Sequence, residues 1–446
     1  MTGTNQLDPT TGPRPGLDHD FNVSYITRVE GEGSLRLRVR DGGVVEARLS
    51  IFEAPRYFEQ LVVGRTPDEV IDIVSRICGI CPVAYQMSAV HAFEDLFGIE
   101  IDPEIRALRR LLYCGEWIQS HALHIYLLHA PDFLGYPSAI AMAADHKSIV
   151  ERGLAIKKLG NLIMSTIGGR AIHPISVRVG GFSRVPRPAA FDELRRVLDG
   201  VVEAAHETVR MVAGFDAPDY RREPRLVALV HPDEYPYNHG RIRSSDGVDL
   251  PVDRWDDAFE ELHVEGTNAL QARTRDGEVY LLGPAARITL AAGTLHPLAA
   301  EALARTGMAE SIRTNIYWSI LARAIELLHA AAEARDIIDA YHRPAEPRVT
   351  WTSRPGRAAW ATEAPRGLLF HRYEVDERGF VAAAQIVPPT SQNQAAIEAD
   401  LAAFAPAVLD LPHEEATLRL EQLIRSYDPC ISCATHFLDL RIEDDS

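Results

Sequence analysis

Four of the five cysteines stand in two Cys-x-x-Cys motifs, one near the start of the chain and one near its end. Cys78 and Cys81 form the first motif, and Cys430 and Cys433 form the second. Two intervening residues allow both thiolates of such a motif to face one metal ion. Alone, each motif could be a zinc half-site or a redox dithiol. A zinc ribbon separates its two motifs by about 15–20 residues, whereas almost the whole chain separates these. If the four sulfurs share one site, the fold must bring its two ends together.

The residues around the two motifs narrow the choice of metal. The segment 76–81 reads Arg-Ile-Cys-Gly-Ile-Cys, and the segment 428–436 reads Asp-Pro-Cys-Ile-Ser-Cys-Ala-Thr-His. Together they resemble the large, catalytic subunit of the [NiFe]-hydrogenases, and the similarity runs from about Arg28 to His436. The resemblance implies a nickel–iron centre whose iron carries CO and CN⁻ ligands, and an enzyme that cleaves H2 heterolytically and reversibly. Thiolates are soft ligands that suit such metals better than carboxylates do.

By position, the resemblance assigns a role to each of the four cysteines. Cys78 and Cys430 would be terminal nickel ligands, whereas Cys81 and Cys433 would bridge nickel and iron. Cys430 would also receive a proton from the cleaved hydrogen. The fifth cysteine, Cys114, lies in a predicted helix among apolar residues, as inert core cysteines do.

The segment Arg28-Val29-Glu30-Gly31 resembles a family motif whose glutamate passes protons to and from a terminal nickel thiolate. From the alternating pattern alone, Glu30 would be a solvated residue in the first strand of a β-hairpin. The resemblance instead implies that Glu30 is the proton carrier of the site.

The segment 363–367, which contains Pro365 and Arg366, resembles a second family motif. Its arginine would lie over the metal centre, where the guanidinium donates to an iron-bound cyanide or acts as a base toward hydrogen. Pro365 and Thr390 would line the pocket of the diatomic ligands.

Histidines and an aspartate cluster near the end of a long predicted helix. The sequence from His129 to Phe133 resembles a family segment whose aspartate, here Asp132, lies near the active-site arginine. His121, His124 and His129 could suggest a zinc site, but no His-Glu-x-x-His motif accompanies them. We therefore expect a packed, hydrogen-bonded helix face at these three histidines.

A further motif implies a magnesium ion. Arg56 to Asp68 is similar to a family block whose glutamate binds a buried magnesium, and Glu59 takes that position. His436 would be its partner ligand. The alternative for Glu59 is an exposed helix residue.

The chain lacks the motifs that would bind an iron–sulfur cluster or a dinucleotide, and this indicates partner subunits. A cubane iron–sulfur cluster usually needs four cysteines, but only Cys114 remains, and no G-x-G-x-x-G dinucleotide loop is present. The resemblance therefore implies an iron–sulfur small subunit. Tyr85 stands where membrane-bound uptake members have histidine, and this resembles the soluble NAD(P)-linked, sulfhydrogenase-type branch. Flavin and NADP would then sit on further diaphorase subunits.

Two other functions remain as alternatives. A hydrogen-sensing regulatory hydrogenase would keep the same motifs and turn over slowly. A metal-free structural relative in a respiratory complex would have lost them. The presence of all four cysteines, Arg366, Glu59 and His436 disfavours the second alternative.

Composition limits the partners. The chain has 446 residues, of which 46% are hydrophobic and 24% charged, as expected of a globular protein with a large core. A formal net charge of −17 disfavours nucleic acid and anionic membranes. No apolar run approaches the ~20 residues of a membrane span, and the first twenty residues have no apolar signal core. We expect a cytoplasmic location.

The pattern predicts an α+β fold that is predominantly helical, with an N-terminal β-hairpin over 23–52 and a β-rich insertion over 225–290. The resemblance implies the [NiFe]-hydrogenase large-subunit fold, with a central helical bundle. We predict a flexible tail over 1–22 and a single domain over 23–436. The resemblance implies that a maturation protease removes 437–446. The predicted helices span 67–75, 83–98, 103–130, 147–167, 188–214, 305–341 and 412–426.

Overall fold

The computed structural model describes residues 16–435. His436 and the predicted extension 437–446 lie outside the described residues, as do residues 1–15 of the predicted tail. The predicted tail boundary at residue 22 is wrong, because β1 (His19–Val23) pairs antiparallel with β2 (Gly33–Arg40).

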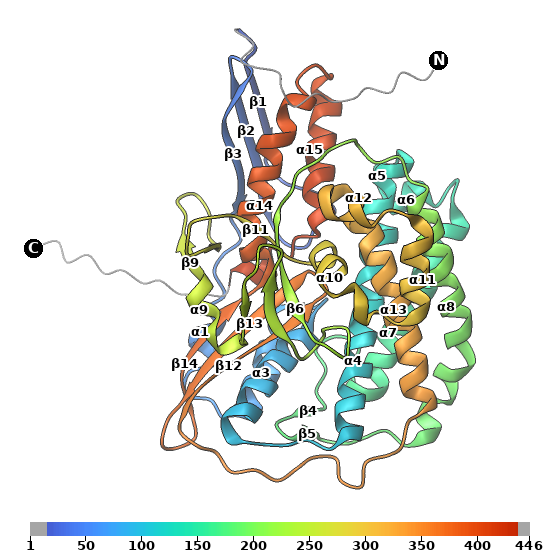
Figure 1. The fold of residues 1–446 in the computed structure, drawn as a ribbon, viewed down its shortest axis with the longest axis vertical. Helices are drawn as coiled ribbons and strands as arrows, with labels where there is room; N and C mark the ends of the chain where they lie inside the picture. Colours follow the sequence, from blue (N-terminus) through green and yellow to red (C-terminus); the bar gives the residue numbers. More distant parts are fainter. Residues whose placement is uncertain (1–15, 436–446) are drawn as a thin grey trace, which may run out of the picture.

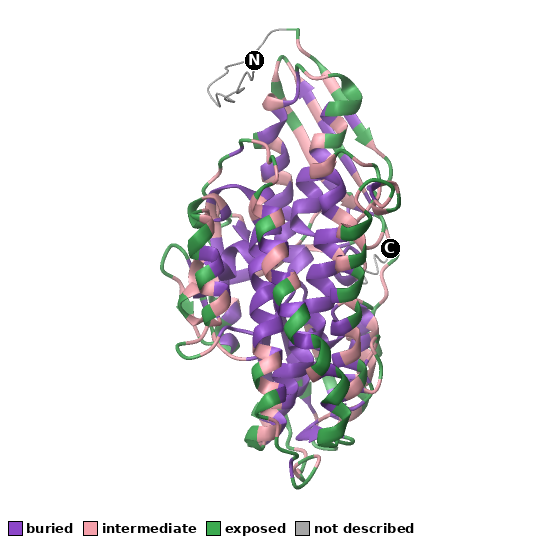
Figure 2. Cartoon of the chain, turned by 90° about the vertical axis from the view of Figure 1, so that its right-hand side faces the viewer, coloured by how far each residue is buried: buried purple, intermediate pink, exposed green. Residues whose placement is uncertain are grey.

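Four long helices pack side by side and contribute much of the core (Figure 1). They are α4 (Pro103–Ala122), α7 (Lys147–Gly168), α8 (Asp192–Ala213) and α13 (Ser319–Asp339). α8 buries one apolar stripe that includes Leu198 and Val201, as its helical spacing predicts. A Cβ at Gly160 of α7 would lie 2.5 Å from the carbonyl oxygen of Gly115 in α4, so glycine is needed where these helices touch. Figure 2 shows the buried residues along the middle of the bundle.

A three-stranded antiparallel sheet lies beside the bundle, in the order β12-β13-β14. Its strands are β12 (Gly356–Ala364), β13 (Gly367–Val375) and β14 (Val381–Val387). α3 (Pro82–Phe97) packs on β12 and β13 (Figure 1). A second hydrophobic cluster joins Leu368 and Phe370 of β13 to Val227 and Leu229 of β6 (Arg225–Val230). The β-rich segment therefore shares a core with the sheet that carries the 363–367 motif.

The N-terminal sheet and the C-terminal helices lie side by side. β1, β2 and β3 (Gly43–Ile51) form the N-terminal sheet, which contacts α14 (Pro389–Phe404) and α15 (His413–Tyr427) (Figure 1). The Ile431 N–H donates to the Glu30 carbonyl at 2.9 Å, which ties the segment after α15 to the loop between β1 and β2. This contact brings the second cysteine motif toward the start of the chain.

The remaining elements are short. The other helices are α1 (Phe58–Leu61), α2 (Pro67–Val74), α5 (Ala130–Leu134), α6 (Ala139–Met142), α9 (Trp255–Ala258), α10 (Pro284–Ala291), α11 (Pro297–Thr306) and α12 (Ala309–Thr314). The other strands are β4 (Val177–Arg178), β5 (Gly181–Phe182), β7 (Arg241–Ser244), β8 (Asp249–Leu250), β9 (Phe259–His263), β10 (Leu270–Thr274) and β11 (Tyr280–Leu281). Among residues 16–435, no helix is both long and apolar enough to span a membrane.

The predicted α+β, mainly helical fold is confirmed, but two predicted helices are wrong in detail. The helix predicted over 305–341 is divided into α11, α12 and α13, because Gly307 ends α11 in a left-handed conformation at φ 66°. The helix predicted over 103–130 leaves α geometry after Ala122, and a π-helical turn over Leu123–His129 leads into α5.

Candidate metal centre

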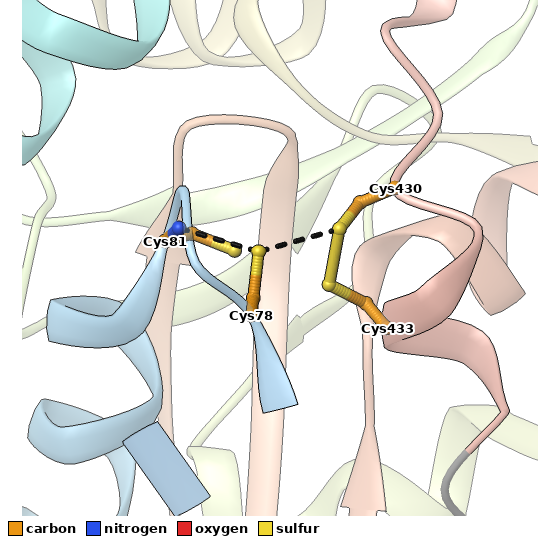
Figure 3. A group of neighbouring side chains, drawn as sticks. All are labelled: Cys78, Cys81, Cys430 and Cys433. Carbon is orange, nitrogen blue, oxygen red and sulfur yellow. Dashed lines mark hydrogen bonds between the residues drawn. A yellow bond between two sulfur atoms is a disulfide. The ribbon is translucent and has the colours of Figure 1, made fainter. Parts of the chain in front are cut away.

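The four motif cysteines meet at one buried point. The sulfur atoms of Cys78, Cys81, Cys430 and Cys433 all lie within 4.8 Å of one another. In the part of the chain that the structure describes, no other group of three or more histidine, cysteine or carboxylate ligands converges in this way. Figure 3 shows one pair approaching from each end of the chain, with Cys78 Sγ 3.4 Å from Cys430 Sγ.

Cys430 and Cys433 are joined by a disulfide (Figure 3). The sequence predicted four metal-binding thiolates, so this pair differs from the expectation. Their Cα atoms lie 5.4 Å apart, a separation at which two cysteines can form a disulfide or bind one metal together. Only the reduced pair offers thiolate ligands.

The first motif is held by the turn that leads into α3. Pro82 occupies the first position of this helix, where its missing N–H costs nothing. The sulfur of Cys78 accepts hydrogen bonds from the backbone N–H groups of Ile80 and Cys81, each at 3.3 Å. Such donors favour a thiolate over a thiol. The turn is therefore shaped around a negatively charged sulfur.

Glu116 of α4 supports the same turn, and sequence reasoning missed it. Its carboxylate accepts hydrogen bonds from the N–H groups of Val83, at 2.6 Å, and Ala84, at 3.2 Å. Burial raises the pKa of Glu116 well above its usual value. The sequence did contain a signal that could have identified Glu116, because it is a glutamate within an otherwise apolar stretch of a predicted helix.

Glu30 lies against the second motif. Its Oε2 is 3.1 Å from Cys430 Sγ and accepts a hydrogen bond from the Ser432 N–H at 3.1 Å. The predicted strand position is wrong, because Glu30 lies in the loop before β2 and is held there by the backbone of Ile431. Gly31, at φ 87°, allows this approach, since a Cβ there would lie 2.7 Å from the Ser432 nitrogen.

Arg366 lies at the tight turn between β12 and β13 and is fully buried. It donates to Asp428, from Nε to the carbonyl at 2.7 Å and from Nη2 to the carboxylate at 3.1 Å. Burial lowers its pKa, but Asp428 and the thiols of Cys81 and Cys78 more than offset this, so the guanidinium stays charged. Its Nη1 is buried and has no hydrogen-bond partner among the described residues. A buried donor without an acceptor costs about 1–3 kcal/mol, so this atom suits a site that holds a further anionic acceptor.

Asp132, which the resemblance placed near Arg366, makes no ion pair with that arginine in the described part of the chain; its contacts are elsewhere. It pairs with Arg28, with Arg425 at 2.8 and 3.0 Å, and with His129 at 3.0 Å. These contacts outweigh burial and lower the pKa of the carboxyl. The carboxylate partner of Arg366 is Asp428, which the sequence shows two residues before Cys430. Asp132 therefore ties α5 to α15.

The three histidines behave as a packed helix face, as expected. His121 contacts Glu326 at 3.1 Å, His124 Nε2 lies 2.8 Å from the Arg425 carbonyl, and His129 pairs with Asp132. All three rings are buried and each has a different partner.

The remaining predicted residues are arranged around Cys430 and β14. The Thr390 hydroxyl accepts a hydrogen bond from the Cys430 N–H at 3.0 Å. The Pro365 carbonyl accepts from Arg287 Nη2 at 3.0 Å. Glu59 Oε1 accepts from the Ile386 N–H at 2.7 Å, and burial raises the pKa of Glu59 to about 7. A divalent cation beside this carboxylate would keep it ionised, and carboxylate oxygen suits magnesium.

The comparisons with known proteins agree over nearly the whole chain. A family described as "Nickel-dependent hydrogenase" matches residues 56–160 and 285–436. The chain is 33% identical over 424 residues to Sulfhydrogenase 1 subunit alpha of Pyrococcus furiosus, which covers 94% of this chain and 98% of that protein. It is 29% identical over 474 residues to NAD-reducing hydrogenase HoxS subunit beta of Cupriavidus necator, covering 93% and 94%.

Two solved hydrogenase structures superpose on nearly the whole of this chain. An NAD⁺-reducing [NiFe]-hydrogenase in the H2-reduced state superposes with a TM-score of 0.86 at 26% identity, covering 94% of this chain and 99% of that chain. The Ni-Fe-Se hydrogenase of D. vulgaris Hildenborough superposes with a TM-score of 0.73 at 22% identity, covering 94% and 100%, and shares the fold.

Proposed function

We propose, because this chain belongs to the nickel-dependent hydrogenase family as a large, catalytic subunit, that its four motif cysteines hold the nickel–iron centre of H2 cleavage. The observation that carries the proposal is the buried cluster of four sulfurs within 4.8 Å. All four cysteines would hold nickel, and Cys81 and Cys433 would also hold iron. When bound, this centre supplies the chemistry that splits H2 into two protons and two electrons.

The donor set fits such a group. Thiolates from both ends of the chain match soft metals, and Cys430 and Cys433 must be reduced before they bind. The unpartnered Nη1 of Arg366 offers a donor for a cyanide on iron. Pro365 and Thr390 line the pocket of CO and CN⁻. Thr390 also holds the backbone of Cys430 in place through its hydroxyl.

Glu30 carries the proton away from the sulfur of Cys430. At 3.1 Å its carboxylate is within transfer distance of that atom. Ser432 lies between Glu30 and a second carboxylate, because its backbone N–H donates to Glu30 and its hydroxyl donates to Glu53 at 2.7 Å. Glu53 is only half-buried, so this second carboxylate lies nearer the surface than the cluster does.

Electrons leave through partner subunits in this proposal. Only Cys114 remains outside the cluster, and it cannot hold an iron–sulfur cluster alone. An iron–sulfur small subunit therefore accepts the electrons, and flavin and NAD(P) on diaphorase subunits receive them next. Two relatives, named as a sulfhydrogenase subunit and an NAD-reducing hydrogenase subunit, support the assignment to the NAD(P)-linked branch of the family. We place the complex in the cytoplasm, where Cys430 and Cys433 remain thiols.

Glu59 and His436 bind magnesium, and the chain after His436 is removed by a maturation protease. Active enzyme should therefore have the mass of a chain that ends at His436. Intact-mass measurement of protein with full hydrogenase activity tests this. Full activity in a chain that still ends at Ser446 would refute the cleavage and leave the cysteine assignment intact.

Replacing Arg366 by lysine should lower the turnover number about 10²–10³-fold, the usual cost of losing one preorganised donor at a reacting centre. Lysine keeps the charge but lacks the planar fork that binds Asp428 through two nitrogens. Initial rates of H2-dependent dye reduction measure the effect. Arg372→Lys, in β13 just beyond the turn that carries Arg366, has a partly buried partner and is the matched control that should retain activity.

Asp132→Ala should destabilise the protein by about 3–5 kcal/mol, since it leaves the buried Arg425 with only the longer ion pair to Glu421 at 3.4 Å among the described residues. It should leave the ratio of nickel to folded protein unchanged, because Asp132 does not contact Arg366. Denaturant unfolding and metal analysis measure the two quantities. Loss of nickel at unchanged stability would instead place Asp132 in the metal centre.

Metal analysis together with H2-dependent dye reduction tests the proposed function as a whole. We expect about one nickel and one iron per chain and rapid turnover. Bound nickel with very slow turnover would favour the hydrogen sensor. Protein that binds neither metal after anaerobic maturation with its partners would exclude both.

A further inference from the structure

Two histidines, each with a ring nitrogen that has no hydrogen-bond partner in the described part of the chain, lie beside one cavity at the far end of α3 from the cysteines. A cavity of about 190 Å³ is lined by His91, Glu94, Asp95, Arg106, His239 and Trp360. His91 is ten residues beyond Cys81 along α3, which corresponds to ~15 Å of helix. The cavity is therefore separate from the thiolate cluster.

The imidazole of His91 is arranged as in known metal sites. Its Nδ1 lies 3.5 Å from the Glu94 carboxylate, which in turn accepts two hydrogen bonds of 2.7 Å from Arg109. Arg109 helps to hold the pKa of Glu94 down to about 2 despite burial, so Glu94 is ionised. A carboxylate at Nδ1 keeps the proton on that nitrogen and leaves the lone pair on Nε2. Burial lowers the pKa of His91, which keeps the ring neutral.

That lone pair has no partner among the described residues. Nε2 of His91 is buried and makes no hydrogen bond within residues 16–435, and the side chain is only 5% exposed. Nε2 of His239, in the loop before β7, is likewise buried without a partner. The two rings lie 4.9 Å apart at 60°, and Trp360 of β12 packs 5.5 Å from each. Both nitrogens lie beside one cavity, where a single ligand could reach them.

The arginines nearest the cavity each have a carboxylate partner. Arg106 is paired with Glu234 at 2.6 Å, Arg109 with Glu94 at 2.7 Å and Arg110 with Glu333 at 2.5 Å, so their positive charge toward the cavity is partly compensated. Asp95 follows His91 by four residues and therefore lies on the same face of α3. It has no ion-pair partner within the described part of the chain, and it lines the cavity rim with an exposed carboxylate. Its side chain can supply a third ligand by rotation, or through a water.

We propose that His91 and His239 bind one divalent transition-metal ion of the zinc type in this cavity, with Asp95 and water completing its coordination. Imidazole nitrogen and carboxylate oxygen suit zinc, and two histidines fix it more firmly than carboxylates alone. The site is distinct from both the thiolate cluster and the Glu59 position.

The test uses enzyme already loaded with nickel and iron, so that the four thiolates are occupied. Zinc is added, unbound metal is removed by gel filtration, and the zinc retained per chain is counted by mass spectrometry. We expect about one equivalent, with nitrogen and oxygen ligands at about 2.0–2.1 Å in the zinc-edge X-ray absorption spectrum. Failure to retain zinc, or sulfur ligands at ~2.3 Å, would overturn the proposal.

Matched variants assign the ligands. His91→Phe and His239→Phe keep an aromatic ring against Trp360 but remove the nitrogens. Each should weaken zinc binding by more than the ~10–100-fold that loss of an orienting partner costs, while H2-dependent activity persists. His206→Phe, on α8, is the control and should bind zinc as the wild type does. If His91→Phe does not fold, the His239→Phe variant still tests the proposal, because His239 is only half-buried. Undiminished zinc binding in His239→Phe would contradict the proposal.

Discussion

Replacing Cys430 by serine should reduce H2-dependent dye reduction to background and remove nickel from the protein. A serine hydroxyl is a hard ligand that is not ionised near neutral pH, so it cannot replace a thiolate in this cluster. The substitution also removes the atom that faces Glu30 at 3.1 Å. Metal analysis and initial rates on the same preparation measure both effects.

Cys114→Ser is the matched control, because it removes a buried cysteine outside the cluster. Cys114 lies in α4, where its nearest polar contact is the Tyr237 hydroxyl at 3.9 Å. We expect normal nickel content and activity. Wild-type activity in Cys430→Ser would refute the assignment of the metal centre, and loss of nickel in Cys114→Ser would show that the cluster is not confined to the two motifs.

Glu30→Gln should slow turnover by about 10²–10⁴-fold, the usual contribution of a positioned acid–base group. Glutamine can still accept the hydrogen bond from the Ser432 N–H, so the loop should keep its shape, but it cannot carry a proton away from Cys430. Nickel and iron content should not change. The exchange of hydrogen between H2 and D2O measures proton transfer separately from electron transfer to the dye.

Glu32→Gln provides the control for this prediction, since Glu32 is an exposed carboxylate in the same loop. It should exchange hydrogen at the wild-type rate. An unchanged exchange rate in Glu30→Gln would remove Glu30 from the proton route, and a loss of nickel would show instead that it supports the metal ligands.

Much of the site could be predicted from the sequence because its metal-binding cysteines can be recognised from their spacing. The four cysteines stand in two short motifs, and the structure brings their sulfurs together. Several helices begin with strong local signals, such as Thr66 and Glu69, which form a capping box before α2. Such helices were predicted to within one or two residues, because local spacing and capping decide where they lie.

What could not be predicted depends on contacts between distant segments. The strand expected around Glu30 is a loop, because the backbone of Ile431 binds it from 400 residues away in the chain. Asp132 and Asp428 are equally acidic in the sequence, and only the fold shows which of them faces Arg366. The break between α11 and α12 depends on one glycine in an alanine-rich stretch, where helix propensity predicted continuity.

One infrared spectrum tests the central assignment most directly. Protein matured anaerobically with its partners should show the stretching bands of metal-bound CO and CN⁻, since the four cysteines are assigned to a nickel–iron centre with those ligands. Cys81→Ser and Cys433→Ser, which remove the proposed bridging ligands, should lack the bands. A fully active wild-type enzyme without them, or a four-cysteine cluster filled by zinc, would contradict the assignment.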